Sequence, residues 1–174
     1  MNALIRLFVQ VCLFRRGPED MPYASPLVVG LLAIWLLVQL LNGLLQTGLS
    51  AAQMLGVQML SMTLMLGATA LALAFKGLPG RWLQTALALI GVDIALSLAS
   101  VPLLLFSLEA GQRLPFVDGL YLLLVAWQLA VQSFIFHRAL VVSPLLGLAF
   151  AFGLLVLTFM LLGVWMPEVF EAGA

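Results

Sequence analysis

The feature that most constrains the fold is a series of five long apolar segments with short polar breaks between them. Each is long enough for a helix to cross a bilayer, which takes about 20 mainly apolar residues. The segments are 26–45, 51–75, 82–108, 119–136 and 144–166. Such runs are too long for strands, and the strands of a membrane barrel would alternate apolar with polar residues. The sequence therefore predicts an all-α integral membrane protein, a five-transmembrane-helix bundle that forms one domain over residues 26–166.

The composition agrees with a chain whose main solvent is lipid. Of the 174 residues, 64% are hydrophobic and 8% are charged, whereas a soluble domain is roughly 25% charged. The formal net charge is zero, and no basic run carries interleaved aromatic residues, so we expect no nucleic-acid partner. Cys12 is the only cysteine, which excludes an internal disulfide and a cysteine-rich metal centre. The partner that the composition implies is a lipid bilayer.

The distribution of basic residues predicts the orientation of the bundle. If the N-terminus lies in the cytoplasm, only Arg113 falls outside among the seven Lys and Arg residues. The residues that fall inside are Arg6, Arg15, Arg16, Lys76, Arg81 and Arg138. Cytoplasmic loops of membrane proteins carry such an excess of basic residues. We therefore expect a protein of the bacterial cytoplasmic (inner) membrane, N-in and C-out, with residues 167–174 as a short outside tail.

The N-terminal segment 1–14 is amphipathic and too short to span. Asn2, Arg6 and Gln10 recur every four residues and give a polar stripe on an otherwise apolar helix. At about 1.5 Å per residue, the segment reaches only about 21 Å, less than the ~30 Å of the hydrocarbon core. This pattern predicts an interfacial helix that lies on the cytoplasmic leaflet.

Residues 15–25 are predicted to form a cytoplasmic elbow between this helix and the first span. We expect Arg15 and Arg16 to anchor the end of the surface helix at the lipid headgroups. Glu19 and Asp20 have no evident role in topology, because acidic residues contribute little to it. The stretch "RRGPED" is therefore predicted to be a cytoplasmic docking point for a partner.

Asp93 is the only acidic residue inside a predicted span. It lies well inside the segment 82–108, about 15 Å deep and so near the middle of the bilayer. A charge at this depth costs at least about 2.5–3.5 kcal/mol on insertion scales, so Asp93 should face protein or water and have a partner. Counting inward along the other spans brings Gln128 and Ser61 to a similar depth, with Gln39 somewhat nearer the outside. We expect these four residues to form a polar layer at the centre of the bundle.

Three interpretations of this layer remain open. In the first, amides and hydroxyls hold the helices together and burial keeps Asp93 neutral. In the second, Asp93 binds or relays a proton or cation. In the third, Asp93 contacts a residue of a partner membrane protein. The span that contains Asp93 also carries a stripe of small residues, Gly91, Ala95 and Ala99, which would let a neighbouring helix approach closely.

Other residues do not form a pattern typical of a cofactor site or an active site. His137 is the only histidine, which favours an interfacial polar residue over a haem or metal ligand. Met59, Met62 and Met65 repeat every three residues, which is more typical of packing than of copper binding. The serines are scattered, and no P-loop or dinucleotide-binding fingerprint is present. We therefore predict no metal, no cofactor and no enzymatic activity.

The segment "WQLAVQSFIFHRALVVSPLLG", from Trp127 to Gly147, resembles the penultimate span of small bacterial inner-membrane proteins of the Yip family, whose eukaryotic members are Rab-interacting proteins. The stretch before the first span, "RRGPEDMPY", is similar to that of some small bacterial members. The resemblance implies a cytoplasmic N-terminus followed by five spans. It also implies a scaffold or trafficking-like accessory role that is exercised through partners.

The function expected from these observations is that of a non-enzymatic accessory, scaffold or assembly subunit of a membrane complex. Other membrane proteins would contact its small-residue helix faces and its cytoplasmic elbow, because the short loops leave almost no soluble domain. The alternative is a small transporter or channel that uses Asp93 to bind a proton or cation.

Overall fold

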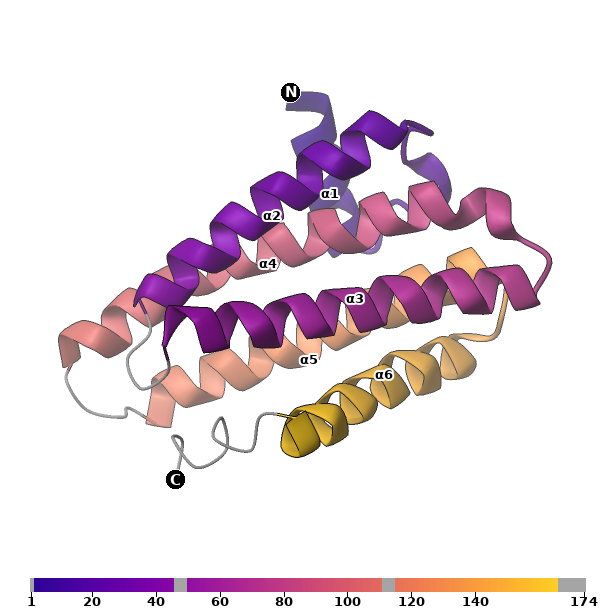
Figure 1. Ribbon diagram of the computed structural model, residues 1–174. Coiled ribbons are helices and arrows are strands. Elements are labelled where there is room, and N and C mark those ends of the chain that lie inside the picture. The colour runs from indigo at the N-terminus through magenta and orange to yellow at the C-terminus, as the bar shows by residue number, and fades with distance from the viewer. Residues whose placement is uncertain (1, 46–49, 111–114, 166–174) are drawn as a thin grey trace.

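The computed structural model describes residues 2–45, 50–110 and 115–165, and within these ranges all regular secondary structure is helical (Figure 1). A short N-terminal helix is followed by five long ones. Their bounds are α1 Asn2–Cys12, α2 Ser25–Leu45, α3 Ala51–Phe75, α4 Trp82–Ala110, α5 Pro115–Leu140 and α6 Pro144–Trp165. Two short 3-10 helices, η1 Pro18–Asp20 and η2 Pro79–Arg81, precede α2 and α4. The prediction of an all-α chain is confirmed.

The helices α2 to α6 are each long and apolar enough to cross a membrane. Their outward faces carry many large apolar side chains. Among them, Leu71, Leu145 and Val164 are 74%, 75% and 76% exposed. Soluble monomers rarely expose apolar surface over so wide an area, so this surface favours lipid as its surroundings. The prediction of five helices that could span a membrane is therefore confirmed by length and composition.

Some helices extend beyond the apolar segments that predicted them. α5 begins at Pro115 and ends at Leu140, four residues beyond the prediction at each end. Proline is well tolerated at the first position of a helix, and Asp118 in the first turn and Arg138 in the last turn suit the helix dipole. Hydropathy marks only the apolar part of a helix, so it underestimates helices with polar ends. The predicted tail, 167–174, lies outside the described residues.

α4 is the central helix of the bundle. It packs against α2 and α5, and α1 and η1 cover a further face. α5 packs closely against α6, and α3 contacts both α2 and α6 (Figure 1). The close approach of α5 and α6 depends on Gly147, because an added Cβ there would lie 2.6 Å from the carbonyl oxygen of Ser133. The long helices alternate in direction, with α2, α4 and α6 running one way and α3 and α5 the other.

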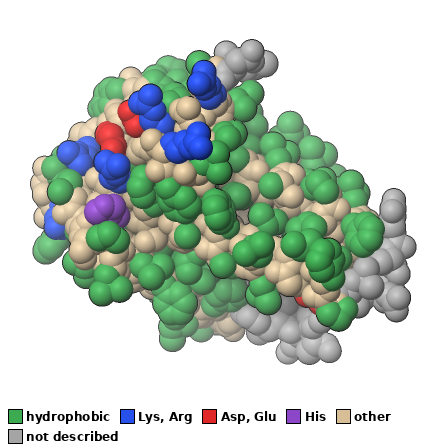
Figure 2. Space-filling model, turned by 180° about the vertical axis from the view of Figure 1, so that it is seen from behind, with side chains coloured by type: hydrophobic (Ala, Val, Ile, Leu, Met, Phe, Trp, Pro, Cys, Tyr) green, Lys and Arg blue, Asp and Glu red, His purple; other side chains and the backbone are tan. Residues whose placement is uncertain are grey.

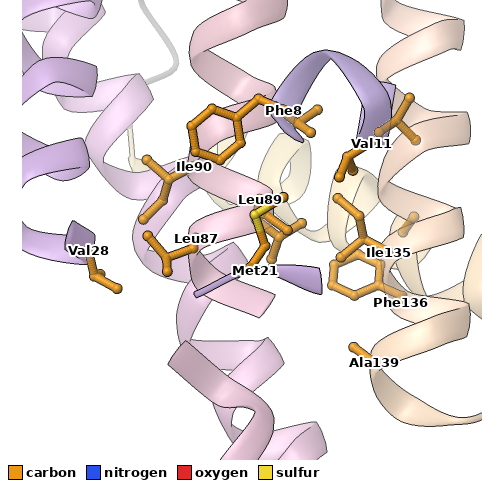
Figure 3. Close-up of a cluster of buried hydrophobic side chains, with 14 of the residues drawn as sticks. Phe8, Val11, Met21, Val28, Leu87, Leu89, Ile90, Ile135, Phe136 and Ala139 are labelled. Atoms are coloured by element: carbon orange, nitrogen blue, oxygen red, sulfur yellow. The ribbon is translucent and has the colours of Figure 1, made fainter. Parts of the chain in front are cut away.

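One end of the bundle is rich in positive charge. Lys76, Arg81 and Arg138 lie where α3 and α5 end and α4 begins, and we call this the basic end. Figure 2 shows Lys and Arg side chains gathered on one side of the molecule, with large apolar areas elsewhere. The tightly packed core lies in the same half, since residues 85–92 of α4 are all buried. Figure 3 shows this core, to which α1, the elbow, α4 and α5 contribute Phe8, Val11, Met21, Leu87, Ile90, Ile135 and Phe136.

α1 packs against α4 well inside that helix, and its last residue contacts the middle of α5. The ring of Phe8 occupies the space that a Cβ at Gly91 would need. The indole N–H of Trp127, halfway along α5, donates to the carbonyl oxygen of Cys12 at 3.1 Å. The helix ends at Cys12, earlier than predicted, and Phe14 beyond it has a left-handed φ of 58°. The small residue Gly91 therefore serves a contact within the chain.

Candidate functional site

Asp93 lies at the centre of a hydrogen-bonded cluster that joins three helices. On α2, the indole N–H of Trp35 donates to Oδ2 of Asp93 at 2.7 Å, and the amide of Gln39 donates to the same oxygen at 3.1 Å. On α5, the amide of Gln128 donates to Oδ1 at 2.9 Å. The carboxyl group thus receives three N–H donors from two neighbouring helices.

Helix geometry explains why these side chains meet. Trp35 and Gln39 are four residues apart, so they lie one above the other on the face of α2 that packs against α4. Ser97 lies one turn beyond Asp93 on α4, and its Oγ accepts a second, longer hydrogen bond from Gln39 at 3.3 Å. Both Trp35 and Gln39 are buried, with exposed fractions of 2% and 4%. The donors are therefore held in place by packing as well as by their hydrogen bonds.

All three donors to Asp93 are electrically neutral. The two ion pairs found among the described residues lie elsewhere, in the elbow and between the elbow and α5. A buried charge is stabilised by an opposite charge or by hydrogen bonds. Here Trp35, Gln39 and Gln128 supply hydrogen bonds to both carboxyl oxygens, and none of the three brings a positive charge to the site.

A cavity of about 200 Å³ lies beside the cluster. All five long helices contribute to its wall, and polar groups form a large part of it. The lining residues that carry polar groups are Trp35, Gln58, Ser61, Asp93, Gln128, Gln132 and Thr158. The apolar part of the wall comes from Met62, Met65, Leu154 and Leu155. The space is large enough for several water molecules or one small polar solute.

The polar side chains of this wall offer mainly acceptor atoms. The hydroxyls of Ser61 and Thr158 donate to carbonyl oxygens of their own helices at 2.8 Å, which leaves their lone pairs open. The amide nitrogen of Gln132 donates to the sulfur of Met65 at 3.6 Å, and its oxygen has no donor within the described residues. The side chain of Gln58 also lines the cavity and has no hydrogen bond within the described residues. The cavity therefore combines one carboxyl group with several neutral oxygens.

The structure brings three of the four residues of the predicted polar layer into direct contact. Gln39, Asp93 and Gln128 are hydrogen-bonded together, whereas Ser61 lines the same cavity without a hydrogen bond to Asp93. Sequence reasoning missed Trp35, the donor with the shortest hydrogen bond to Asp93. Its spacing of four from Gln39 was the signal that could have found it. The other cavity residues that were not predicted are Gln58, Gln132 and Thr158.

The described residues hold no group of three or more His, Cys, Asp and Glu side chains that could bind a metal ion. His137 hydrogen-bonds through Nδ1 to the carbonyl oxygen of Val142, at the turn between α5 and α6. Of the three spaced methionines, Met62 is buried, Met65 lines the cavity and Met59 is 45% exposed. These contacts are structural, so the chemistry of the site rests on Asp93.

The elbow residues predicted as a docking point have partners within the chain. Asp20 accepts from Arg16 at 2.9 Å and from the backbone N–H of Gly17 at 3.1 Å. The N–H of Gly17 and, to a lesser degree, Arg16 hold the pKa of Asp20 below its ordinary value. Glu19 pairs with Arg138 of α5 at 3.1 Å. The exposed Arg15 has a backbone contact to α1 and no side-chain partner within the described range.

No protein-family model, no curated protein and no solved structure matches this chain. Nothing in these comparisons bears on the similarity to the Yip family, which stays a prediction. The class of protein is that of an all-helical chain with five potential membrane spans. Its function has to be argued from the geometry of the site.

Proposed function

We propose that this protein is a multi-pass membrane protein that binds a monovalent cation or a proton at Asp93, as a small transporter or channel would. The observation that supports this function is the cavity of about 200 Å³ in which one carboxyl group stands among neutral oxygens. An ionisable residue inside a spanning bundle is a functional-site hypothesis by default. Polar contacts that only held helices together would need no open space beside them, because protein interiors are close-packed.

The single carboxyl group among the described residues of the cavity wall favours an occupant with a single positive charge, because its ionisation would supply one negative charge. One carboxylate balances one unit of charge, whereas Ca²⁺ and Mg²⁺ sites combine carboxylates with further oxygens or with substrate phosphates. The oxygens of Gln58, Ser61 and Thr158 supply the neutral ligands that a small monovalent cation takes in transporters. A hydronium ion or a protonated amine would use the same acceptors.

The proposed environment is the bacterial inner membrane, with the N-terminus and the basic end in the cytoplasm. The excess of Lys and Arg on that side supports this orientation. Asp93 lies eleven residues after Trp82, the first residue of α4, which is about 16 Å along the helix axis. In a hydrocarbon core of about 30 Å this is close to the middle, where a substrate site of a transporter is usual.

The test is ion flux in proteoliposomes that contain the purified protein. An imposed gradient of H⁺, Na⁺ or K⁺ is expected to collapse faster with the protein than without it, and Asp93→Asn should abolish the effect at equal protein content. Asp118→Asn is the matched control, because Asp118 is an exposed acidic residue in the first turn of α5. Absence of flux for all three ions, or full flux in Asp93→Asn, would contradict the proposal.

The accessory role predicted from the sequence is a second candidate, and a surface on α3 favours it. Thr63, Gly67 and Ala70 line an apolar groove, and an added Cβ at Gly67 would meet nothing within 4 Å. Small residues on an open helix face let a helix of another membrane protein approach closely. If this role is correct, Gly67→Leu should remove a partner that co-purifies in mild detergent, and Gly30→Leu, at another open glycine, should not.

A further inference from the structure

A second cleft lies at the basic end, away from the cavity around Asp93. Its volume is about 190 Å³. Three segments that are far apart in the sequence form it: the elbow, the start of α4 and the end of α5. The residues that carry the argument are Glu19, Arg81, Gln84, Thr85 and Arg138.

Two arginines face this cleft, and most of their N–H groups are unused. Arg81 makes only long contacts, from one guanidinium nitrogen to the carbonyl oxygens of Arg138 and Ala139 at 3.4 and 3.5 Å. Arg138 donates to Glu19 at 3.1 Å, and its guanidinium lies 5.5 Å from the ring centre of Phe134. Two guanidinium groups and one carboxylate leave the cleft with one net positive charge.

The wall of the cleft is fixed before any ligand arrives. The amide of Gln84 donates to the backbone carbonyl of Met21 at 2.8 Å and, more weakly, to that of Glu19 at 3.4 Å. Thr85 is fully buried and its hydroxyl donates to the carbonyl of Arg81 at 2.9 Å. Pro18 and Met21 of the elbow are buried against the helices. A preformed site loses less entropy when it binds a ligand than a mobile one does.

We propose that this cleft binds the phosphate group of an anionic phospholipid from the leaflet at the basic end. A planar guanidinium matches a phosphate group with two parallel hydrogen bonds. Basic pockets between spanning helices on the cytoplasmic side are suited to anionic headgroups. The cleft lies where α4 begins and α5 ends, which is headgroup level for both spans.

The surroundings of the cleft favour a lipid over a free phosphate ion. Val141, two residues after Ala139, is 64% exposed, and Leu145 and Leu146 at the start of α6 are 75% and 59% exposed. The acyl chains of a bound lipid would cover these apolar side chains, whereas a free phosphate ion would leave them exposed. The proposal does not depend on the function proposed for Asp93, because the two sites share no residue.

The experiment measures phosphatidylglycerol bound to the protein in a neutral detergent, by native mass spectrometry during a lipid titration. The double variant Arg81→Gln/Arg138→Gln is expected to weaken the binding at least about tenfold, since each basic residue near an anionic lipid surface contributes appreciably. Arg6→Gln/Lys76→Gln removes the same charge from exposed basic residues that do not line the cleft and should change the binding less than about twofold. Phosphatidylcholine should bind no better to the wild type than to the double variant.

A further variant separates loss of the site from loss of the fold. Glu19→Gln frees Arg138 and removes the one carboxylate among the described residues that line the cleft, so it should strengthen phosphatidylglycerol binding, which a folding defect would not do. Equal losses in the two double variants would overturn the proposal in favour of a non-specific basic surface. Competition by inorganic phosphate at the concentrations that lipid requires would overturn it in favour of a free-ion site.

Discussion

Polar side chains join different helices at two levels of the bundle, the centre and the basic end. The central contacts are hydrogen bonds from neutral groups, whereas the contacts at the basic end include an ion pair. At the centre, Asp93 accepts hydrogen bonds from neutral groups of α2 and α5. At the basic end, Glu19 and Arg138 form an ion pair that is exposed to solvent. The exposed fractions of their side chains are 48% and 50%. Hydrogen bonds gain strength where water is absent, whereas exposed ion pairs are screened by solvent. A hydrogen bond to Asp93 should therefore contribute more to the free energy of unfolding than the Glu19–Arg138 ion pair does.

The largest effect is expected from removing a donor at the centre. Gln128→Leu leaves Oδ1 of Asp93 without its hydrogen bond at 2.9 Å, and the loss should destabilise the bundle by about 2–3 kcal/mol, as for a buried acceptor left unpaired. The free energy of unfolding in mixed micelles, titrated with a denaturing detergent, measures the loss.

Gln132→Leu is the matched control for this variant. Gln132 lies one turn further along α5 and donates only to the sulfur of Met65, at 3.6 Å. A thioether is a weak acceptor, so we expect a loss well below 1 kcal/mol. If both variants lose the same stability, the three donors of Asp93 have no special importance and the contrast between the two levels is wrong.

The next effect concerns α1, which covers the face of α4 that carries Gly91. Gly91→Val would place a branched side chain where the ring of Phe8 now lies, and the crowding should cost about 1–2 kcal/mol. Displacement of α1 would also uncover Cys12, the only cysteine. Burial raises the pKa of its thiol, so the wild type should react slowly with a maleimide at neutral pH.

The rate at which a maleimide labels Cys12 therefore reports whether α1 is packed against α4. Gly91→Val is expected to speed the reaction severalfold, while Gly119→Val, at a glycine with open space around it, should leave the rate unchanged. An unchanged rate in Gly91→Val, with the helix content preserved, would show that Phe8 does not hold α1 in place.

The spans could be predicted from the sequence because the membrane requirement acts on a continuous run of residues. Depth counting along those spans also pointed to Gln39 and Gln128 as neighbours of Asp93. It did not find Trp35, because tryptophan counts among the hydrophobic residues of the composition although its indole N–H donates to Asp93 at 2.7 Å. Nor could it show that the hydroxyl of Ser61 bonds to its own helix, an alternative open to any helical serine.

The elbow could not be predicted in the same way, because its contacts join residues that are far apart in the chain. Glu19 and Arg138 are separated by 119 positions, and no local pattern links them. The placement of α1 depends on the single missing side chain of Gly91, which a stripe of small residues indicates without naming its partner. Both cases involve tertiary contacts that follow from how α4 and α5 pack.

The ion pair of Glu19 and Arg138 should contribute much less than the central cluster. A double-mutant cycle with Glu19→Gln and Arg138→Gln is expected to give a coupling energy of about 0.2–1 kcal/mol, as for other exposed pairs. The coupling should fall further in high salt, because salt screens exposed charges. A coupling energy as large as the loss in Gln128→Leu would remove the distinction between the two levels.

The smallest effect is a dependence of stability on pH through Asp20. The pKa of Asp20 is lowered in the folded chain, chiefly by the backbone N–H of Gly17 and further by Arg16. The stability that these contacts contribute is therefore complete above the ordinary pKa of an aspartate, about 3.9, and is lost as the pH falls through the lower folded value. The side chain is 30% exposed, so the contribution should stay well under 1 kcal/mol. Unfolding of the wild type and of Asp20→Asn, compared at pH 6 and pH 3, tests this: the gap between the two proteins should narrow on acidification, and a constant gap would mean that the elbow is not held by the charge of Asp20.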